Sequence, residues 1–214
     1  MIDSYKHKGM RKNLVNELRE KGITDERVLE AFNQVPRHFF LDRIFEKQAY
    51  SNTAFRIGAN QTISHPYTVV FQTQMLDIKK GDKVLEIGTG SGFQTAVLCE
   101  MGAKVFSIER QRELYLKAKP LLTKLGYKPT LKYGDGYKGW DVFAPFDKII
   151  ITCGAPFIPE DLVNQLKIGG KMIIPVGEGE KQEMVLIVKN EKGECDIYKK
   201  GVFKFVPMLK NTAK

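Results

Sequence analysis

Residues 83–92, KVLEIGTGSG, constrain the fold of this chain more than any other stretch. The first half is a β-branched and aliphatic run, which is typical of a buried strand. The predicted strand is followed by a glycine-rich turn at 88–92, and residues 93–101 after the turn are predicted to form a helix. Glycines allow a ligand to approach the backbone closely, and the N–H groups and dipole of a helix N-terminus attract negative charge. The sequence therefore predicts an anion- or nucleotide-binding corner.

An acidic residue follows the second predicted strand. Glu109 ends this apolar run and lies 21 positions beyond Gly88. In parallel nucleotide-binding sheets, an acidic side chain at this place meets the ribose hydroxyls. A dinucleotide enzyme is disfavoured, because its fingerprint requires a glycine where this chain has Phe93. A glycine-rich turn without a ligand is the simpler alternative, and Glu109 weighs against it.

The glycine turn is a GxGxG pattern preceded by an acid, Glu86-Ile87-Gly88. This pattern resembles motif I of the class I S-adenosylmethionine-dependent methyltransferases. Three later segments fit the same family: GDG at 134–136, where an aspartate can bind adenine; TCGAP at 152–156, in the place of acceptor-site residues; and LKIGGK at 166–171, the usual turn into the fifth strand. Each segment alone can be a simple β-turn, but their order and positions together favour a methyl-donor site.

Composition sets the general class. A length of 214 residues suits one α/β domain with an elaboration, or at most two small domains. No apolar stretch reaches the length of a membrane-spanning helix, and the first residues lack the apolar core of a signal peptide. Cys99, Cys153 and Cys195 are widely spaced and form no CxxC pair, so we expect reduced thiols, no metal and a cytoplasmic location.

The net charge is +9 and the pI is about 9.3. A basic balance can indicate nucleic acid or an acidic substrate. The lysines are nevertheless spread along the chain, and the longest basic runs are pairs such as Lys79-Lys80 and Lys199-Lys200. A solvated lysine-rich surface is the simpler explanation, and we expect neither a nucleic-acid nor a membrane partner.

The first eighty residues are predicted to be mainly helical. An apolar stripe predicts a helix over 10–21, ended by Gly22, and a second helix begins near Thr24 or Asp25 and ends at Pro36. Residues 49–65 have no long period and are predicted to form a loop with short extended pieces, which at this length is usually functional. A third helix is expected to run from Pro66 to about residue 76.

From residue 81 onward, strands and helices alternate, which predicts a parallel sheet. We expect strands at 83–87, 104–108, 130–133, 147–152 and 171–175, with helices at 93–101, 111–125 and 159–166. Two further strands, at 184–189 and 196–205, are joined by a polar turn and predict an antiparallel edge. The expected fold class is α/β: a mostly parallel Rossmann-like methyltransferase sheet with an antiparallel C-terminal edge and an N-terminal helical extension. Residues 1–80 and 81–214 are expected to form one monomeric unit.

The segment at 57–67, IGANQTISHPY, is more specific than the glycine turn. It resembles the IG-x-x-QTIS-x-PY signature of the protein-L-isoaspartate O-methyltransferase family. The agreement covers nearly the whole chain and continues at 35–39, 85–92, 134–140, 175–177, Gln182 and 205–207. Two local departures border the acceptor cleft: His65 stands where glutamine is common, and residues 68–71 replace a run of smaller residues.

The resemblance implies a reaction. A methyl group passes from S-adenosylmethionine to the free carboxylate of an L-isoaspartyl residue in a damaged protein or peptide, leaving S-adenosylhomocysteine. The ester then closes to a succinimide, which reopens partly to normal aspartate. A free carboxylate, with a pKa of about 4, is already ionised at pH 7, so no general base is expected. Alignment of the reacting atoms is the main requirement, and orientation of this kind can supply about 7–11 kcal/mol.

The resemblance also implies site residues. Ser64 matches the active-site serine and is expected to orient the acceptor carboxylate, the alternative being a capping serine for the next helix. Cofactor contacts are expected from Gln61, Thr62, Ile63, Glu86, Gly88, Thr89, Gly90, Ser91, Gly92, Glu109, Arg110, Gly134, Asp135 and Gly136. Substrate contacts are expected from Ile57, Gly58, Ser64, His65, Cys153, Gly154 and Ala155. His38 and an exposed His65 are also compatible with purely structural roles.

Two other functions compete with this interpretation. A class I methyltransferase acting on RNA would ordinarily carry an Asn-Pro-Pro-Tyr type motif after the fourth strand, where this chain has TCGAP. A non-catalytic protein could use the same fold to sense S-adenosylmethionine, and the intact QTIS segment weighs against it.

Overall fold

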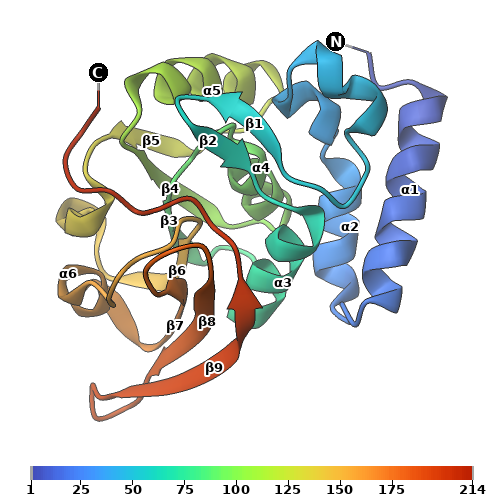
Figure 1. Cartoon of the computed structure of the whole chain (residues 1–214). Helices are drawn as coiled ribbons and strands as arrows, with labels where there is room; N and C mark the ends of the chain where they lie inside the picture. Colours follow the sequence, from blue (N-terminus) through green and yellow to red (C-terminus); the bar gives the residue numbers. More distant parts are fainter. Residues whose placement is uncertain (1, 214) are drawn as a thin grey trace.

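Seven strands form one mixed sheet in the order β5-β4-β3-β6-β7-β8-β9 in the computed structural model, which describes residues 2–213 (Figure 1). The parallel strands are β3 (Lys83–Ile87), β4 (Lys104–Glu109), β5 (Thr130–Tyr133), β6 (Phe146–Ile151) and β7 (Leu166–Val176). The antiparallel edge consists of β8 (Gln182–Lys189) and β9 (Cys195–Phe203). The expected parallel sheet with an antiparallel C-terminal edge is confirmed.

The strand order reverses at β3, which pairs with β4 on one side and with β6 on the other. Ligands of open α/β sheets bind at such a reversal, beyond the carboxyl ends of the strands. Val84, Leu85 and Ile87 of β3 are buried, as expected for a strand covered on both faces. The sheet therefore places the glycine turn after β3 at the usual ligand-binding position of the fold.

Helices cover both faces of the sheet. They are α1 (Tyr5–Glu20), α2 (Glu26–Gln34), α3 (Pro66–Leu76), α4 (Phe93–Glu100), α5 (Arg112–Lys124) and α6 (Glu160–Asn164). The bounds of α3 agree with the sequence prediction. No helix among residues 2–213 has the length and apolarity needed to cross a membrane.

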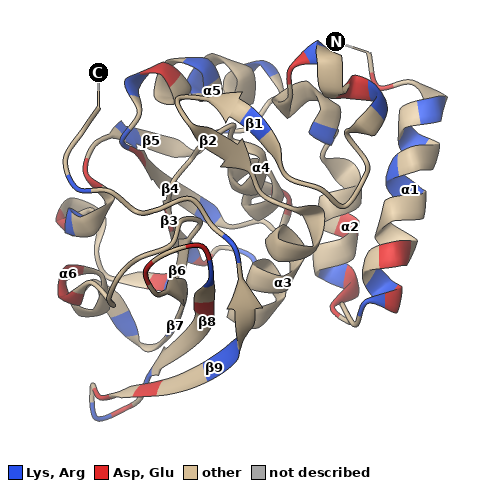
Figure 2. Ribbon diagram, in the orientation of Figure 1, with Lys and Arg blue, Asp and Glu red and all other residues tan. Residues whose placement is uncertain are grey.

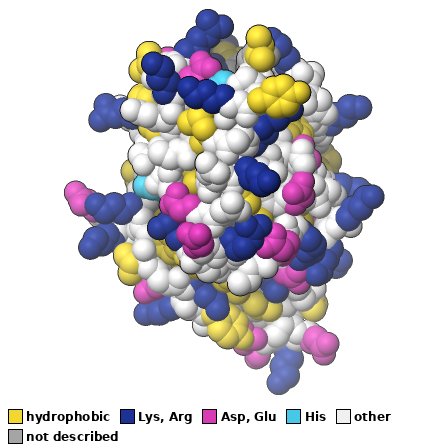
Figure 3. All heavy atoms as spheres, turned by 90° about the vertical axis from the view of Figure 1, so that its right-hand side faces the viewer, with side chains coloured by type: hydrophobic (Ala, Val, Ile, Leu, Met, Phe, Trp, Pro, Cys, Tyr) yellow, Lys and Arg dark blue, Asp and Glu magenta, His cyan; other side chains and the backbone are white. Residues whose placement is uncertain are grey.

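Charged residues occur along most elements of the ribbon, with few on the central strands (Figure 2). On the face in Figure 3, lysine and arginine side chains alternate with acidic ones and form no single basic area. This distribution agrees with the interpretation of the positive charge as a solvated surface.

Helix α1 begins five residues earlier than predicted. Ser4 caps it, accepting a hydrogen bond from the His7 N–H at 3.3 Å, while the His7 ring accepts one from the Ser4 N–H at 3.4 Å. This is a capping box in which histidine replaces the usual glutamate or glutamine. The start at Tyr5 was not predicted, because histidine is not a usual residue of a capping box and because the apolar stripe begins only at Met10.

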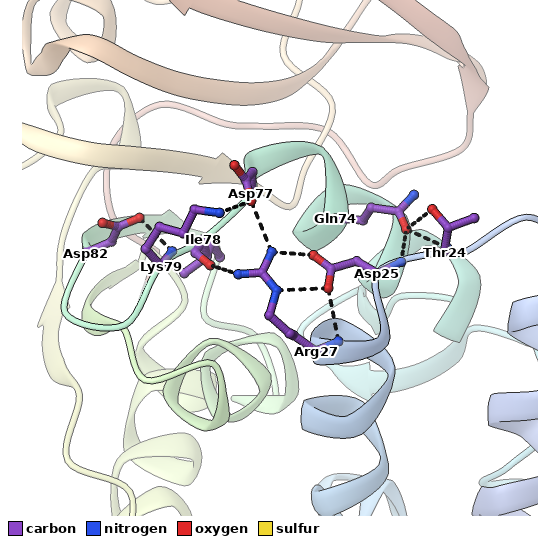
Figure 4. A network of polar contacts seen from close by, with 8 residues as sticks. All are labelled: Thr24, Asp25, Arg27, Gln74, Asp77, Ile78, Lys79 and Asp82. Carbon is purple, nitrogen blue, oxygen red and sulfur yellow. Dashed lines mark hydrogen bonds and ion pairs between the residues drawn. The ribbon is translucent and has the colours of Figure 1, made fainter.

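The N-terminal helices share a core with helices α4 and α5, which pack on the sheet. Phe32 of α2 meets Phe93 of α4 edge to face at 5.5 Å, and both side chains are fully buried. A polar network links the start of α2 to the end of α3 (Figure 4). In this network Arg27 donates to Asp25, Asp77 and the Ile78 carbonyl at 2.7–3.1 Å.

The predicted loop at 49–65 contains a hairpin of β1 (Phe55–Gly58) and β2 (Gln61–Ile63). Two short 3-10 helices, at Arg37–Phe40 and Arg43–Gln48, precede it. The fully buried Arg37 donates to the carbonyl oxygens of Ala49, Thr53 and Ser64 at 2.6–3.1 Å. One guanidinium thus fixes both ends of the hairpin. The neighbouring His38 is buried against the Tyr50 hydroxyl at 2.7 Å, an environment that fits its structural interpretation.

The segment at 166–171 differs from the prediction. We expected a helix over 159–166 and then a turn, but α6 ends at Asn164 and β7 already begins at Leu166. The pairing of β6 with β7 is irregular between Phe146 and Lys148. Gly170 permits the close approach there, because a Cβ would lie 2.7 Å from the Lys167 carbonyl oxygen. The glycines mark a strand irregularity rather than a turn.

Candidate active site

A cavity lies at the carboxyl ends of β3, β4 and β6, where the strand order reverses. We call it the first cavity. Its walls come from the QTIS segment, the glycine turn, the end of β4, the start of the 3-10 turn after β5, the residues after β6 and the segment after β9. The lining residues are Gln61, Thr62, Ile63, Ser64, Val69, Ile87, Gly88, Thr89, Gly90, Ser91, Phe93, Gln94, Ile108, Glu109, Arg110, Gly136, Thr152, Cys153, Val206, Pro207, Met208 and Leu209.

The glycine turn forms one wall of the first cavity. Gly88 and Gly90 have φ values of 96° and 55°, which other residues rarely adopt. A Cβ on Gly88 would lie 2.6 Å from the Thr152 hydroxyl oxygen, which donates to the Gly88 carbonyl at 2.8 Å. Gly92 belongs to the predicted set but does not line the cavity. It is the N-cap of α4 and packs against Leu122.

Glu109 joins the end of β4 to the glycine turn. Its two carboxylate oxygens accept the N–H groups of Gly90 at 2.7 Å and Gln111 at 2.8 Å. Burial raises the pKa of Glu109, and the backbone hydrogen bonds oppose this change. The carboxylate thus fixes the turn and also faces the first cavity, as the prediction of a ribose contact requires.

Glu86 does not reach the first cavity. The side chain is fully buried, and one of its oxygens accepts a hydrogen bond from the Thr95 hydroxyl. Burial raises the pKa of Glu86 to about 8, so the acid is largely protonated at neutral pH. Its place beneath the turn indicates that it supports the turn and does not contact a ligand directly.

The GDG segment after β5 is only partly in the site. Gly136 lines the first cavity, and a Cβ there would lie 2.4 Å from a methyl carbon of Ile87. Gly134 and Asp135 are not among the lining residues. The Asp135 carboxylate accepts the N–H groups of Tyr137 at 2.9 Å and Asn211 at 2.8 Å. In this structure Asp135 therefore holds the segment after β9.

Ser64 lies where two cavities meet. A second cavity, of about 340 Å³, shares Thr62, Ser64, Thr152 and Val206 with the first. The Ser64 carbonyl is held by Arg37 at 3.1 Å, so the backbone at this residue is fixed from behind. Ser64 and the three other shared residues therefore form the boundary between the two cavities.

The other predicted substrate residues are divided between the two cavities and positions outside them. His65 lines the second cavity, and burial, with a smaller contribution from Arg37, lowers its pKa. Cys153 lines the first cavity, and burial raises its pKa to about 12, which keeps the thiol neutral. Gly154 and Ala155 face away from both cavities, with their N–H groups donating to Val206 and Pro175 carbonyls.

Ile57 and Gly58 of β1 also lie outside the two cavities. The Ile57 side chain instead contacts the glycine turn, because a Cβ on Gly90 would lie 3.4 Å from the Ile57 methyl carbon. Gly58 packs against Glu113 of α5. These two residues hold the hairpin against the glycine turn and α5, and the QTIS segment that follows them forms one wall of the first cavity.

The segment 206–209 is the part of the site that the sequence prediction missed. It crosses the carboxyl edge of the sheet after β9, and its residues line the first cavity. Met208 donates to the Gly154 carbonyl at 2.7 Å, and the Tyr137 hydroxyl donates to the Met208 carbonyl at 3.2 Å. The predicted Arg110 lines the cavity and donates to the Asn211 carbonyl, just beyond this segment, at 3.0 Å. The only sequence signal was the family resemblance at 205–207.

A seven-stranded sheet with an antiparallel C-terminal edge, and a glycine turn preceded by a buried acid at its strand reversal, is the arrangement of the class I S-adenosylmethionine-dependent methyltransferases. The family model described as "Protein-L-isoaspartate(D-aspartate) O-methyltransferase (PCMT)" matches residues 9–213. The chain belongs to this family. Its reaction is the methylation of isoaspartyl residues in proteins, with S-adenosylmethionine as methyl donor.

Individual relatives agree with this assignment. A protein-L-isoaspartate O-methyltransferase of Christiangramia forsetii is 57% identical over 212 residues, covering 99% of both chains. A solved protein-L-isoaspartate O-methyltransferase matches with a TM-score of 0.84 and 28% identity over 94% of this chain and 66% of the other. A Plasmodium falciparum structure in complex with S-adenosyl-L-homocysteine has the same fold, with a TM-score of 0.82 and 24% identity, covering 94% of this chain and 99% of the other.

Proposed function

We propose that the first cavity holds S-adenosylmethionine and that the isoaspartyl carboxylate reaches it through the second cavity, beside Ser64. The observation that carries this proposal is the position of Ser64, which lines both cavities. Methylation of the carboxylate produces an ester, whose closure to a succinimide and reopening to aspartate repairs the damaged linkage.

The residues around the first cavity fit this cofactor. Gly88 and Gly136 both line the cavity, and a Cβ at either position would collide with Thr152 or Ile87. Without side chains at these two positions, a ligand can approach the backbone closely. The Glu109 carboxylate, nearly closed to solvent, can accept hydroxyl groups of a ribose. We assign the glycine turn to the methionine end and Gly136 to the adenine end. The bound cofactor supplies an activated methyl group, and the protein has to position the acceptor.

The protein groups near Ser64 can orient a carboxylate without taking a proton from it. The acceptor is ionised at neutral pH, and the Ser64 hydroxyl can donate a hydrogen bond to it. The N-terminus of α3, which starts at Pro66, adds a favourable positive dipole. Burial lowers the pKa of His65 and raises that of Cys153, so both are largely neutral at pH 7 and neither adds a competing charge.

We also propose that the chain acts as a monomer in the cytoplasm and that nucleic acid is not its partner. The mixed charge distribution in Figure 3 supports the last point, since no continuous basic surface appears on that face. Light scattering of the purified protein and salt-dependent RNA binding are the direct measurements.

The central experiment compares two peptides that differ only in one linkage. Methyl-labelled S-adenosylmethionine is incubated with the protein and either an isoaspartyl peptide or the matching aspartyl peptide. We expect base-labile label in the isoaspartyl peptide alone. Equal labelling of both peptides, or RNA binding without ester formation, would contradict the proposed function.

A further inference from the structure

A third cavity, of about 720 Å³, continues the path that leads away from Ser64. It lies between α3, β9 and the end of α1, and it shares His65, Thr68 and Lys204 with the second cavity. The second cavity in turn shares Ser64 with the first. The three cavities therefore adjoin one another in a row, from the third cavity through the second to the glycine turn.

Aromatic side chains form the floor of the third cavity. Tyr67 and Phe71 of α3 lie 5.7 Å apart, and the Phe203 ring of β9 lies 5.0 Å from Phe71. Tyr67 and Phe203 are nearly parallel at 6.4 Å. Such a floor packs against the backbone and the methylene groups of a peptide, but by itself it selects no charge.

Three lysines line the same cavity: Lys21 at the end of α1, and Lys200 and Lys204 of the β9 segment. No aspartate or glutamate is among the described residues that line it. Three acidic residues lie nearby: Glu17, 3.8 Å from the Lys21 ammonium, Glu180 of the second cavity, 3.6 Å from that of Lys204, and Glu183, which accepts the Gly201 N–H at 3.1 Å. The two ion pairs are solvent-exposed and weak, and none of the three carboxylates lines the third cavity, so the charges on its lining are positive.

We infer that the third cavity binds the part of the substrate next to the isoaspartyl residue and that acidic side chains in that part are preferred. The inference rests on the proposed function, because the third cavity adjoins the second cavity, which Ser64 lines. The occupant is a polypeptide, because a cavity of about 720 Å³ with an apolar floor beside the acceptor position fits the residues that flank the isoaspartyl residue. Charge complementarity then sets the preference, with the lysines facing carboxylates of the flanking residues.

The preference is expected to be modest and sensitive to salt. Exposed ion pairs are individually weak, so three lysines predict a KM about 3- to 10-fold lower for an acidic flank than for a basic one at low ionic strength. Above about 0.15 M salt the Debye length is shorter than about 8 Å, and the difference in KM shrinks. The carboxylate beside Ser64 is bound independently, so kcat is expected to stay the same.

Isoaspartyl peptides with acidic, neutral or basic residues on either side are the probes. The wild-type chain is compared with Lys200→Glu and with the matched control Lys199→Glu. Lys199 precedes Lys200 on β9, is exposed and does not line the third cavity, so both variants change the net charge equally. A double variant, Lys21→Glu with Lys200→Glu, provides a larger change on separate elements.

We expect the acidic flank to have the lowest KM in the wild type and in Lys199→Glu, and this order to weaken or reverse in Lys200→Glu and in the double variant. Equal KM values for all flanks in the wild type, or equal effects of the two single variants, would overturn the inference. Either result leaves the proposed function intact if the neutral peptide is methylated. Failure to methylate any isoaspartyl peptide would instead refute the proposed function.

Discussion

Glu109 offers the sharpest test of the cofactor assignment. The carboxylate accepts two backbone N–H groups, from Gly90 and Gln111, and faces the first cavity. Glu109→Gln keeps the shape of the side chain but removes its negative charge. The amide NH2 group then faces one of these N–H donors and cannot accept its hydrogen bond. A hydrogen bond to a charged group contributes about 1.5–3 kcal/mol. Because about 1.4 kcal/mol corresponds to a tenfold change, we expect the Kd for the cofactor to rise about 10- to 100-fold.

Isothermal titration with S-adenosylhomocysteine measures this effect directly. The control is Glu160→Gln, because Glu160 at the start of α6 is exposed and does not line the first cavity. We expect the control to bind within about twofold of the wild type. A Glu109→Gln protein that is folded and binds as tightly as the control would refute the assignment of Glu109 to the cofactor.

Three further predictions concern catalysis, ionisation and folding. Ser64→Ala is expected to lower turnover about 10- to 100-fold through loss of one hydrogen bond to a carboxylate, with cofactor affinity unchanged; steady-state kinetics with normal turnover would remove Ser64 from the mechanism. Burial raises the pKa of Glu86 to about 8, so the folded chain keeps a proton that the unfolded chain releases, and stability from this group falls as pH rises from about 4.5 to 8. In urea unfolding, the free energy of unfolding of Glu86→Gln should therefore rise relative to that of the wild type across this pH range. A difference between the two proteins that does not change with pH would refute the raised pKa of Glu86. Phe32→Ala should lower the free energy of unfolding by about 3–5 kcal/mol and leave a single unfolding transition, because residues 1–80 and 81–214 share this core. Separate unfolding transitions by Trp140 fluorescence and by circular dichroism would show two independent units.

Local signals allowed much of this structure to be predicted. Pro66 fixed the start of α3, and the apolar run before the glycine turn fixed β3, so both elements have the predicted bounds. The QTIS segment and the glycine turn meet across one cavity, as the family resemblance implied. These features depend on neighbouring residues in sequence, which a single sequence displays.

Features set by distant contacts could not be predicted in the same way. The segment 206–209 carries no local pattern, and its course follows from hydrogen bonds to Gly154 and Tyr137. Asp135 has the right position after β5 for an adenine ligand, but the Asn211 N–H occupies one of its oxygens. The strand β7 begins early because pairing with β6 continues through a glycine irregularity.

The wall formed by residues 206–209 also has a consequence for protein synthesis. The first cavity needs residues 61–64 and 206–209 together, so it joins parts of the chain that a ribosome makes far apart in time. The cavity is therefore incomplete until residue 209 has left the ribosomal exit tunnel, by which time all seven strands of the sheet have been translated.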